Sequence, residues 1–146
     1  MIKYVKGDAT QPIGEGGKLI IHCCNDEIKW GAGFVLALSK RWKQPEAMFR
    51  ALKNPVLGDV QFVPVEPNII VVNMIGQHGI KALPNDSPIR YDAINTALKK
   101  VNAYAIKYRY TVHCPRFGAG LAGGNWNVIE ALINANITVD VTVYDF

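Results

Sequence analysis

Two short glycine-containing segments each stand between an apolar run and a predicted helix. The first contains Gly31-Ala32-Gly33, and the second places four glycines among the seven residues 118–124. Glycine adopts positive φ angles readily and lets a ligand approach the backbone closely. Successive amide N–H groups in such a turn form a concavity for anions, and the helix N-terminus adds a partial positive charge. The pattern predicts phosphate binding; the alternative is that the glycines only form tight turns.

Neither segment is a nucleotide-binding fingerprint by itself. Gly118-x-Gly120 lacks the third glycine of the dinucleotide pattern, and no glycine followed by lysine and a hydroxyl residue is present. Cys23, Cys24 and Cys114 form no C-x-x-C pair, and no cluster of possible ligands has metal-binding spacing. We therefore expect neither a cofactor nor a metal ion, and we expect the cysteines to be reduced strand residues.

Polar and aromatic residues near the two ends of the sequence suggest how a base could be bound. Asp8 follows the first apolar run, and its carboxylate could accept a hydrogen bond from an exocyclic amine such as that of adenine. The alternative is that Asp8 caps a turn together with Thr10. Tyr144 and Phe146 follow the last apolar run, where an aromatic ring stacks on a base or closes the core.

The composition favours a soluble globular protein. The chain has 146 residues, of which 49% are apolar and 19% charged, and its net charge is +4. This length suits one domain, 1–146. No apolar run approaches the roughly 20 residues that cross a bilayer, and the beginning of the chain has no signal-peptide pattern. We expect a cytoplasmic monomer without membrane contact, and the scattered basic residues favour a small anionic ligand over nucleic acid.

Six apolar runs rich in β-branched residues are predicted to be strands, and four amphipathic segments are predicted to be helices. The predicted strands are 2–5, 18–24, 59–65, 68–75, 111–114 and 137–146. The predicted helices are 34–42, 45–53, 87–108 and 125–135. Pro45 is expected at a first helical position, Ser87 with Pro88 at a helix start and Asn125 at an N-cap.

The alternation of strands and helices predicts an α/β fold. In this fold, helices cover both faces of a mixed, mostly parallel sheet, which gives three layers, α/β/α. Ligands of such sheets bind outside the carboxyl ends of the strands. The loops that follow strands, including both glycine-containing segments, are therefore the expected ligand-binding loops.

Several segments, in this order, resemble the macrodomain family, which binds ADP-ribose. They are "YVKGDAT", "IIHCCNDEIKWGAGFVLALSKRW", "VVNMIGQHGI", "SPIRYDAI", "PRFGAGLAGGNW" and "VTVYDF". The resemblance covers essentially the whole chain. It is similar in particular to the compact branch that contains terminal ADP-ribose protein glycohydrolase and the yeast ADP-ribose-1″-phosphate phosphatase. The partner implied is ADP-ribose, free or attached to a protein.

The resemblance also implies roles for individual residues. Asp8 would meet the adenine amine, with the Ala9 backbone and Phe146 beside the base, and His22 would shape the pocket. The residues implied at the distal ribose and one side of the pyrophosphate are Asn25, Trp30, Gly31, Ala32, Gly33 and Phe34. Those implied on the other side, through backbone amides, are Arg116, Phe117, Gly118, Ala119, Gly120, Leu121, Ala122 and Gly123.

The catalytic pair of the related glycohydrolase is not matched. That branch uses a lysine and an aspartate, and Gln77 and Ala122 occupy these positions here. An amide cannot serve as an amine nucleophile, and a methyl group cannot accept a proton. Lys81 would substitute only if its loop folds back. The remaining catalytic candidates are Asn25, which could orient a water, Gln77, and His78, whose alternative role is that of an exposed loop histidine.

The resemblance thus predicts an ADP-ribose-binding protein and an ADP-ribosyl hydrolase. The expected substrate is an ester that links ADP-ribose to a glutamate or aspartate of a protein. Such an ester is labile, so an aligned water could suffice without a strong base. Two alternatives stay open: a phosphatase acting on ADP-ribose-1″-phosphate, and a non-catalytic reader of ADP-ribose.

Overall fold

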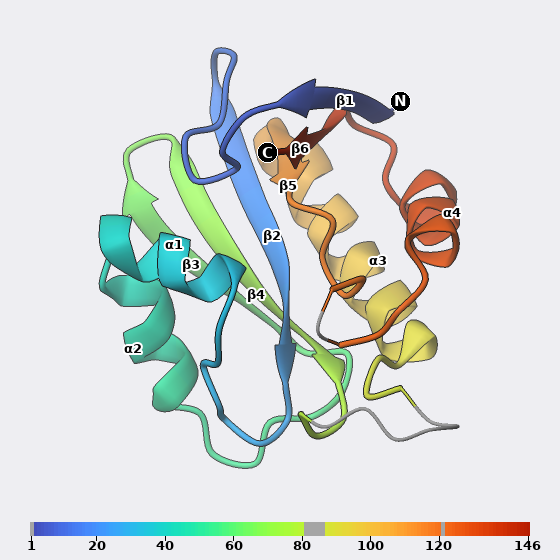
Figure 1. The fold of residues 1–146 in the computed structure, drawn as a ribbon. Helices are drawn as coiled ribbons and strands as arrows, with labels where there is room; N and C mark the ends of the chain where they lie inside the picture. The colour runs from blue at the N-terminus through green and yellow to red at the C-terminus, as the bar shows by residue number, and fades with distance from the viewer. Residues whose placement is uncertain (1, 81–86, 121) are drawn as a thin grey trace.

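Six strands form one sheet in the computed structural model, which describes residues 2–80, 87–120 and 122–146 (Figure 1). The strands are β1 (Ile2–Lys6), β2 (Gly17–Asn25), β3 (Val60–Glu66), β4 (Ile69–Gln77), β5 (Tyr110–Cys114) and β6 (Val141–Asp145). Their order across the sheet is β1-β6-β5-β2-β4-β3. Every neighbouring pair is parallel except β3 with β4, so the prediction of a mixed, mostly parallel sheet is confirmed.

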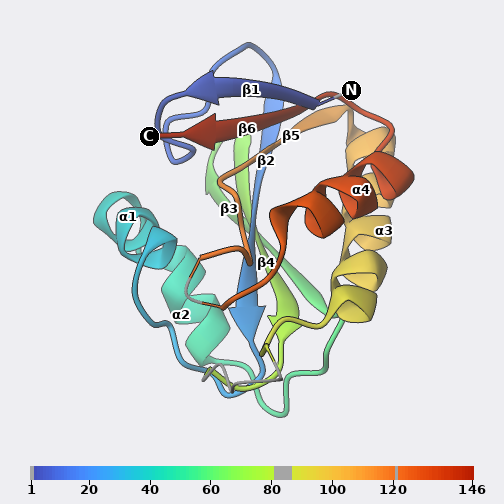
Figure 2. The same ribbon diagram turned by 45° about the vertical axis from the view of Figure 1, so that its right-hand side comes forward.

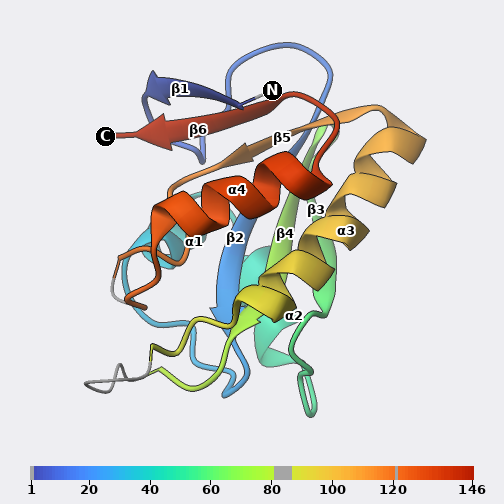
Figure 3. The ribbon, with the colours of Figure 1, turned by 90° about the vertical axis from the view of Figure 1, so that its right-hand side faces the viewer.

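Helices cover both faces of this sheet. They are α1 (Phe34–Arg41), α2 (Gln44–Arg50), α3 (Tyr91–Tyr108) and α4 (Trp126–Asn136). Figures 2 and 3 show α1 and α2 on one face and α3 with α4 on the other, which confirms the three layers. Strand β2 alternates between two cores: Leu19 and Ile21 pack in the core beneath α3 and α4, and Ile20 packs in the core beneath α1 and α2.

The third helix begins four residues later than predicted, at Tyr91. Ser87 is not the helix start, because Ile89 pairs with Gln77 and this pairing keeps the segment before Tyr91 extended. Instead the segment 87–90 runs beside the end of β4, where Ile89 pairs with Gln77. The Ser87 hydroxyl donates to the carbonyl of Ala122 over 2.6 Å, which ties this segment to the loop after β5.

Other helix and strand boundaries in the structure differ by a few residues from the predicted ones. Pro45 is the second residue of α2, which ends at Arg50 and not at residue 53. Residues 137–140 lie outside β6. The N-cap predicted at Asn125 is confirmed, because its side chain accepts a hydrogen bond from the backbone N–H of Asn127.

The parallel strands place several loops at one edge of the sheet. Strand β2 pairs with β4 on one side and with β5 on the other, all three parallel. After β2 the chain continues into α1 and α2, and after β5 into α4, so it crosses to opposite faces of the sheet. The carboxyl ends of these strands therefore meet at a point where the connections diverge, which is where α/β sheets bind ligands. No helix within the described ranges is long and apolar enough to cross a membrane.

Candidate functional site

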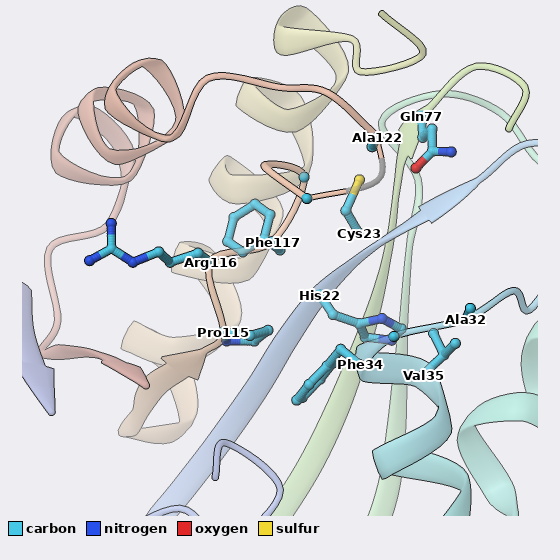
Figure 4. A pocket seen from close by; sticks show the side chains of 13 residues that line it. His22, Cys23, Ala32, Phe34, Val35, Gln77, Pro115, Arg116, Phe117 and Ala122 are labelled. Carbon is cyan, nitrogen blue, oxygen red and sulfur yellow. The ribbon is translucent and has the colours of Figure 1, made fainter. Parts of the chain in front are cut away.

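A cavity of about 310 Å³ lies at the carboxyl ends of β2 and β5 (Figure 4). The loop after β2 and the start of α1 supply one wall, with Ala32, Gly33 and Phe34. The loop after β5 supplies the opposite wall, with Gly118 and Gly120 among its residues. The two glycine-containing segments of the sequence thus face each other across one cavity, which we call the central cavity.

The glycines of the second loop serve two purposes. Gly118 has a φ of +77°, and its carbonyl accepts a hydrogen bond of 2.8 Å from the N–H of Gly124. A Cβ on Gly124 would lie 2.4 Å from that carbonyl oxygen, so these two glycines are needed for the turn itself. A Cβ on Gly120 would meet no atom within 4 Å. Gly120 lines the central cavity with its backbone, which a side chain would otherwise cover.

A second cavity, of about 160 Å³, adjoins the central one and shares several lining residues with it, including Cys23, Ala32 and Gln77. Asn25 and Lys29 also line this second space, which we call the β2-loop cavity. The Asn25 carboxamide organises the loop around it. Its Nδ2 donates to the Lys29 carbonyl over 2.7 Å, and its Oδ1 accepts from the backbone N–H of Lys29 over 3.1 Å.

A third cavity, of about 500 Å³, lies at the other end of the central one and shares Gly33 with it. Asp8 and Phe146 line this space, which we call the α1 cavity. Asp8 Oδ1 accepts bonds of 2.8 Å from both the N–H and the hydroxyl of Thr10, so the turn-capping alternative does occur. Phe146 is 94% exposed, whereas Tyr144 is buried and closes the core.

His22 lies at the base of the central cavity and is buried. Its Nε2 is 2.5 Å from Asn73 Oδ1. The Asn73 amide nitrogen donates to the Pro45 carbonyl and to Gln61 Oε1, so its oxygen must be the acceptor for His22. Burial lowers the pKa of His22 to about 4 despite this bond, so the ring is neutral near pH 7. The ring lines the cavity, and its hydrogen bond to Asn73 holds the tautomer with the proton on Nε2.

Cys23 was not predicted as a site residue, but its side chain lies between the central and β2-loop cavities. Burial raises the pKa of its thiol to about 12. A thiol with that pKa is protonated at neutral pH and is a poor nucleophile. In the sequence, Cys23 lies in a continuous apolar run, and nothing there distinguishes it from a cysteine of the core.

Of the three predicted catalytic candidates, Asn25 and Gln77 line cavities, and His78 lines none of the three. His78 Nδ1 is 2.7 Å from Asp26 Oδ2, and its side chain is 63% exposed. Burial raises the pKa of Asp26, but hydrogen bonds from Gly79 N–H and His78 outweigh it, so this pKa lies below its usual value. His78 therefore ties two loops together beside the site.

Arg116 reaches the central cavity through its backbone. Its guanidinium forms two hydrogen bonds with Asp145, of 2.7 and 3.1 Å, and lies over the rings of Tyr4 and Trp126. Figure 4 shows this side chain pointing away from the cavity.

Most of the other predicted ligand residues line a cavity, and a few do not. Those absent from all three linings are Ala9, Ala119 and Gly123. Leu121 and Lys81, both named from the sequence, lie outside the described residues. Within the described part of the chain, no group of three His, Cys, Asp or Glu residues could hold a metal ion.

Acid should destabilise the fold through two buried histidines. Burial, with nearby Lys18 in the case of His113, lowers the pKa values of His22 and His113 from 6.5 to about 4. Between these values the unfolded chain binds more protons, so the free energy of unfolding falls as the pH falls through that window. Each histidine contributes up to about 3 kcal/mol. Urea denaturation between about pH 7 and pH 4 measures the effect, and His113→Gln should remove about half of it; a midpoint independent of pH would contradict it.

Comparison with solved structures found close likenesses over the whole chain. A protein of unknown function from Bacteroides thetaiotaomicron is 51% identical, with a TM-score of 0.96 over 100% of this chain and 98% of that one. A macrodomain protein from Streptomyces coelicolor is 50% identical, with a TM-score of 0.87 over 100% and 99%. The DarTG protein of Thermosipho africanus, in complex with ADP-ribose, is 14% identical, with a TM-score of 0.69 over 86% of this chain and 37% of that one. This last similarity is one of fold alone.

Among curated proteins, the chain is similar to the chromodomain-helicase-DNA-binding protein 1-like of Mus musculus and of Danio rerio. Each is 31% identical over 93% of this chain. The chain spans only 16% and 14% of the length of these two relatives. No protein-family profile matches it.

Proposed function

The chain belongs to the macrodomain family, and from that premise we propose that it binds ADP-ribose along the three joined cavities. The observation that carries the proposal is the bare backbone at Gly33 and Gly120, which face the central cavity between two end cavities. A pyrophosphate at that place would meet amide N–H donors. The two cavities on either side would bind the adenosine at one end of the ligand and the distal ribose at the other.

The residues that line the two end cavities indicate which end of ADP-ribose each cavity would bind. The α1 cavity offers the Asp8 carboxylate and the exposed rings and methyl groups of Phe146 and Leu36, which suit a planar base with an amino group. The smaller β2-loop cavity offers the carboxamides of Asn25 and Gln77, which suit ribose hydroxyls. Adenine would therefore occupy the first and the distal ribose the second.

We further propose hydrolysis of an ester at the distal ribose. The described lining of the β2-loop cavity contains no carboxylate or histidine, and the pKa values of its two thiols are raised, so both are protonated at neutral pH. Chemistry there would depend on an aligned water and on the lability of an ester to a protein carboxylate, with Gln77 or Asn25 orienting that water. The same lack of a strong base favours the second candidate function, a reader that binds ADP-ribose without turnover.

Three ligands separate these functions. Release of ADP-ribose from a glutamate-ADP-ribosylated protein supports the hydrolase, and loss of phosphate from ADP-ribose-1″-phosphate supports the phosphatase. Saturable calorimetric binding of ADP-ribose with neither turnover supports the reader. Folded protein that gives no saturable heat with ADP-ribose would overturn the proposed binding itself.

Removing the Asp8 carboxylate should weaken ADP-ribose binding. Asp8→Ala would leave the adenine amine without an acceptor, at a cost of about 1–3 kcal/mol. Asp8→Asn is the matched variant, because its amide oxygen can still accept the two bonds from Thr10 that hold the turn. Titration calorimetry should show a loss with both variants. Wild-type affinity in Asp8→Asn would exclude a direct contact between the carboxylate and adenine.

A further inference from the structure

One face of helix α1 forms a wall of the α1 cavity. Gly33, Leu36, Ala37, Lys40 and Arg41 all line it. Because these positions recur at intervals of three and four residues, they share one side of the helix. The wall starts at Gly33, which also lines the central cavity, and ends at two cationic side chains.

No described residue forms an ion pair with either of these two cations, Lys40 and Arg41, in contrast to Arg50, which pairs with Glu46. The Arg41 guanidinium lies 5.2 Å from the Trp42 ring centroid, a contact that leaves its N–H donors available. Among the described residues that line the same cavity, Asp8 is the one with an acidic side chain.

We propose that Lys40 and Arg41 form a subsite for a further phosphate, carried by the ribose of the adenosine half of the ligand. The proposal rests on ADP-ribose binding as proposed above. Seven and eight residues of helix separate Gly33 from Lys40 and Arg41, a rise of about 11–12 Å. An adenosine bound along this wall would have its 5′ phosphate near Gly33 and its ribose hydroxyls toward Lys40 and Arg41. Guanidinium and ammonium groups are the usual partners of phosphate.

Two ligands carry this chemistry. One is ADP-ribose with a phosphate ester on the 2′ hydroxyl of its adenosine, and the other is a linear dimer of ADP-ribose, in which that hydroxyl carries the next unit. Both place additional phosphate beyond the adenosine ribose, although at different distances. Comparing them identifies the source of the recognised phosphate.

The two cations also lie in the last turn of α1, where positive charge complements the helix dipole. A purely structural role predicts that replacing them changes stability slightly and affects all ligands equally. A phosphate subsite predicts a change in the ratio of two affinities. The ratio is therefore the quantity to measure.

The test is titration calorimetry of the full chain with ADP-ribose, its 2′-phosphate ester and the dimer, at low and moderate salt. We expect the ester or the dimer to bind about tenfold more tightly than ADP-ribose, because charge-assisted contacts to phosphate add to the affinity. The gain should shrink at the higher salt concentration. In the double variant Lys40→Gln/Arg41→Gln the gain should disappear.

The matched control is Lys43→Gln/Lys53→Gln, which removes the same charge at two exposed positions that line none of the three cavities. It should keep the full ratio. Equal affinities of wild-type protein for all three ligands, or a gain that survives in Lys40→Gln/Arg41→Gln, would overturn the subsite while ADP-ribose binding stands. Absence of any binding of ADP-ribose to folded wild-type protein would instead contradict the proposed function.

Discussion

Gly120→Val should reduce the affinity for ADP-ribose by about 100-fold or more. Gly120 lines the central cavity, and a Cβ there would meet no protein atom within 4 Å, so we expect a valine side chain to extend into the space that the ligand needs. The branched side chain would hold the pyrophosphate away from the amide donors of the loop. Loss of two hydrogen bonds to a charged group, each worth about 1.5–3 kcal/mol, corresponds to a fall of this size.

The fold itself should tolerate this change. Gly120 has no positive φ angle, and the new side chain meets no neighbour, so the thermal midpoint without ligand should stay close to that of the wild type. Calorimetry with ADP-ribose measures the loss, and differential scanning calorimetry without ligand checks the fold. A folded Gly120→Val protein with undiminished affinity would show that the pyrophosphate does not lie against this loop.

Gly124→Ala, four residues further on, should have the opposite effect: a large loss of stability. The new methyl group would lie 2.4 Å from the Gly118 carbonyl oxygen and 3.1 Å from Ile89. These are a backbone atom and a core side chain, so the turn must open to make room. Overpacking of this kind costs about 2–3 kcal/mol, which for a chain of this length lowers the melting temperature by about 5–10 °C.

Gly120→Ala is the matched control, since it adds the same methyl group to the same loop in open space. Thermal unfolding should show a clear decrease for Gly124→Ala and a small change for Gly120→Ala. Equal midpoints for the two variants would mean that the contact between Gly124 and Gly118 does not constrain the loop.

Much of the fold could be predicted from the sequence, because the pattern of apolar residues indicates which segments are buried. Strands buried on both faces, such as β2 and β4, are nearly continuous in apolar character, and this is how a central parallel strand differs from an edge strand. The helix start at residue 91 was not predicted, because Ser87-Pro88 is compatible both with a cap and with an extended segment. Only the pairing of Ile89 with Gln77 decides between them.

The site was predictable where it depends on backbone exposure and not where it depends on side-chain direction. Glycines after strands marked both walls of the central cavity. Nothing in the sequence distinguishes Arg116, whose guanidinium turns to Asp145, from an arginine that faces a ligand. Cys23, Lys29 and Lys40 line cavities because of the direction in which each residue points. That direction depends on strand alternation and on the rotation of each helix, and both can be assigned only when the arrangement of the layers is known.

Hydrogen bonds from Gln61 through Asn73 to His22 connect the base of the central cavity with β3, an edge strand of the sheet. Gln61 also donates to the carbonyl of Met48 in α2. In laboratory evolution toward a new ligand, beneficial substitutions should therefore arise in β3 and α2 as well as around the cavity. A screen restricted to the cavity lining would miss positions at the edge of the sheet and in α2 that hold the His22 imidazole through Asn73.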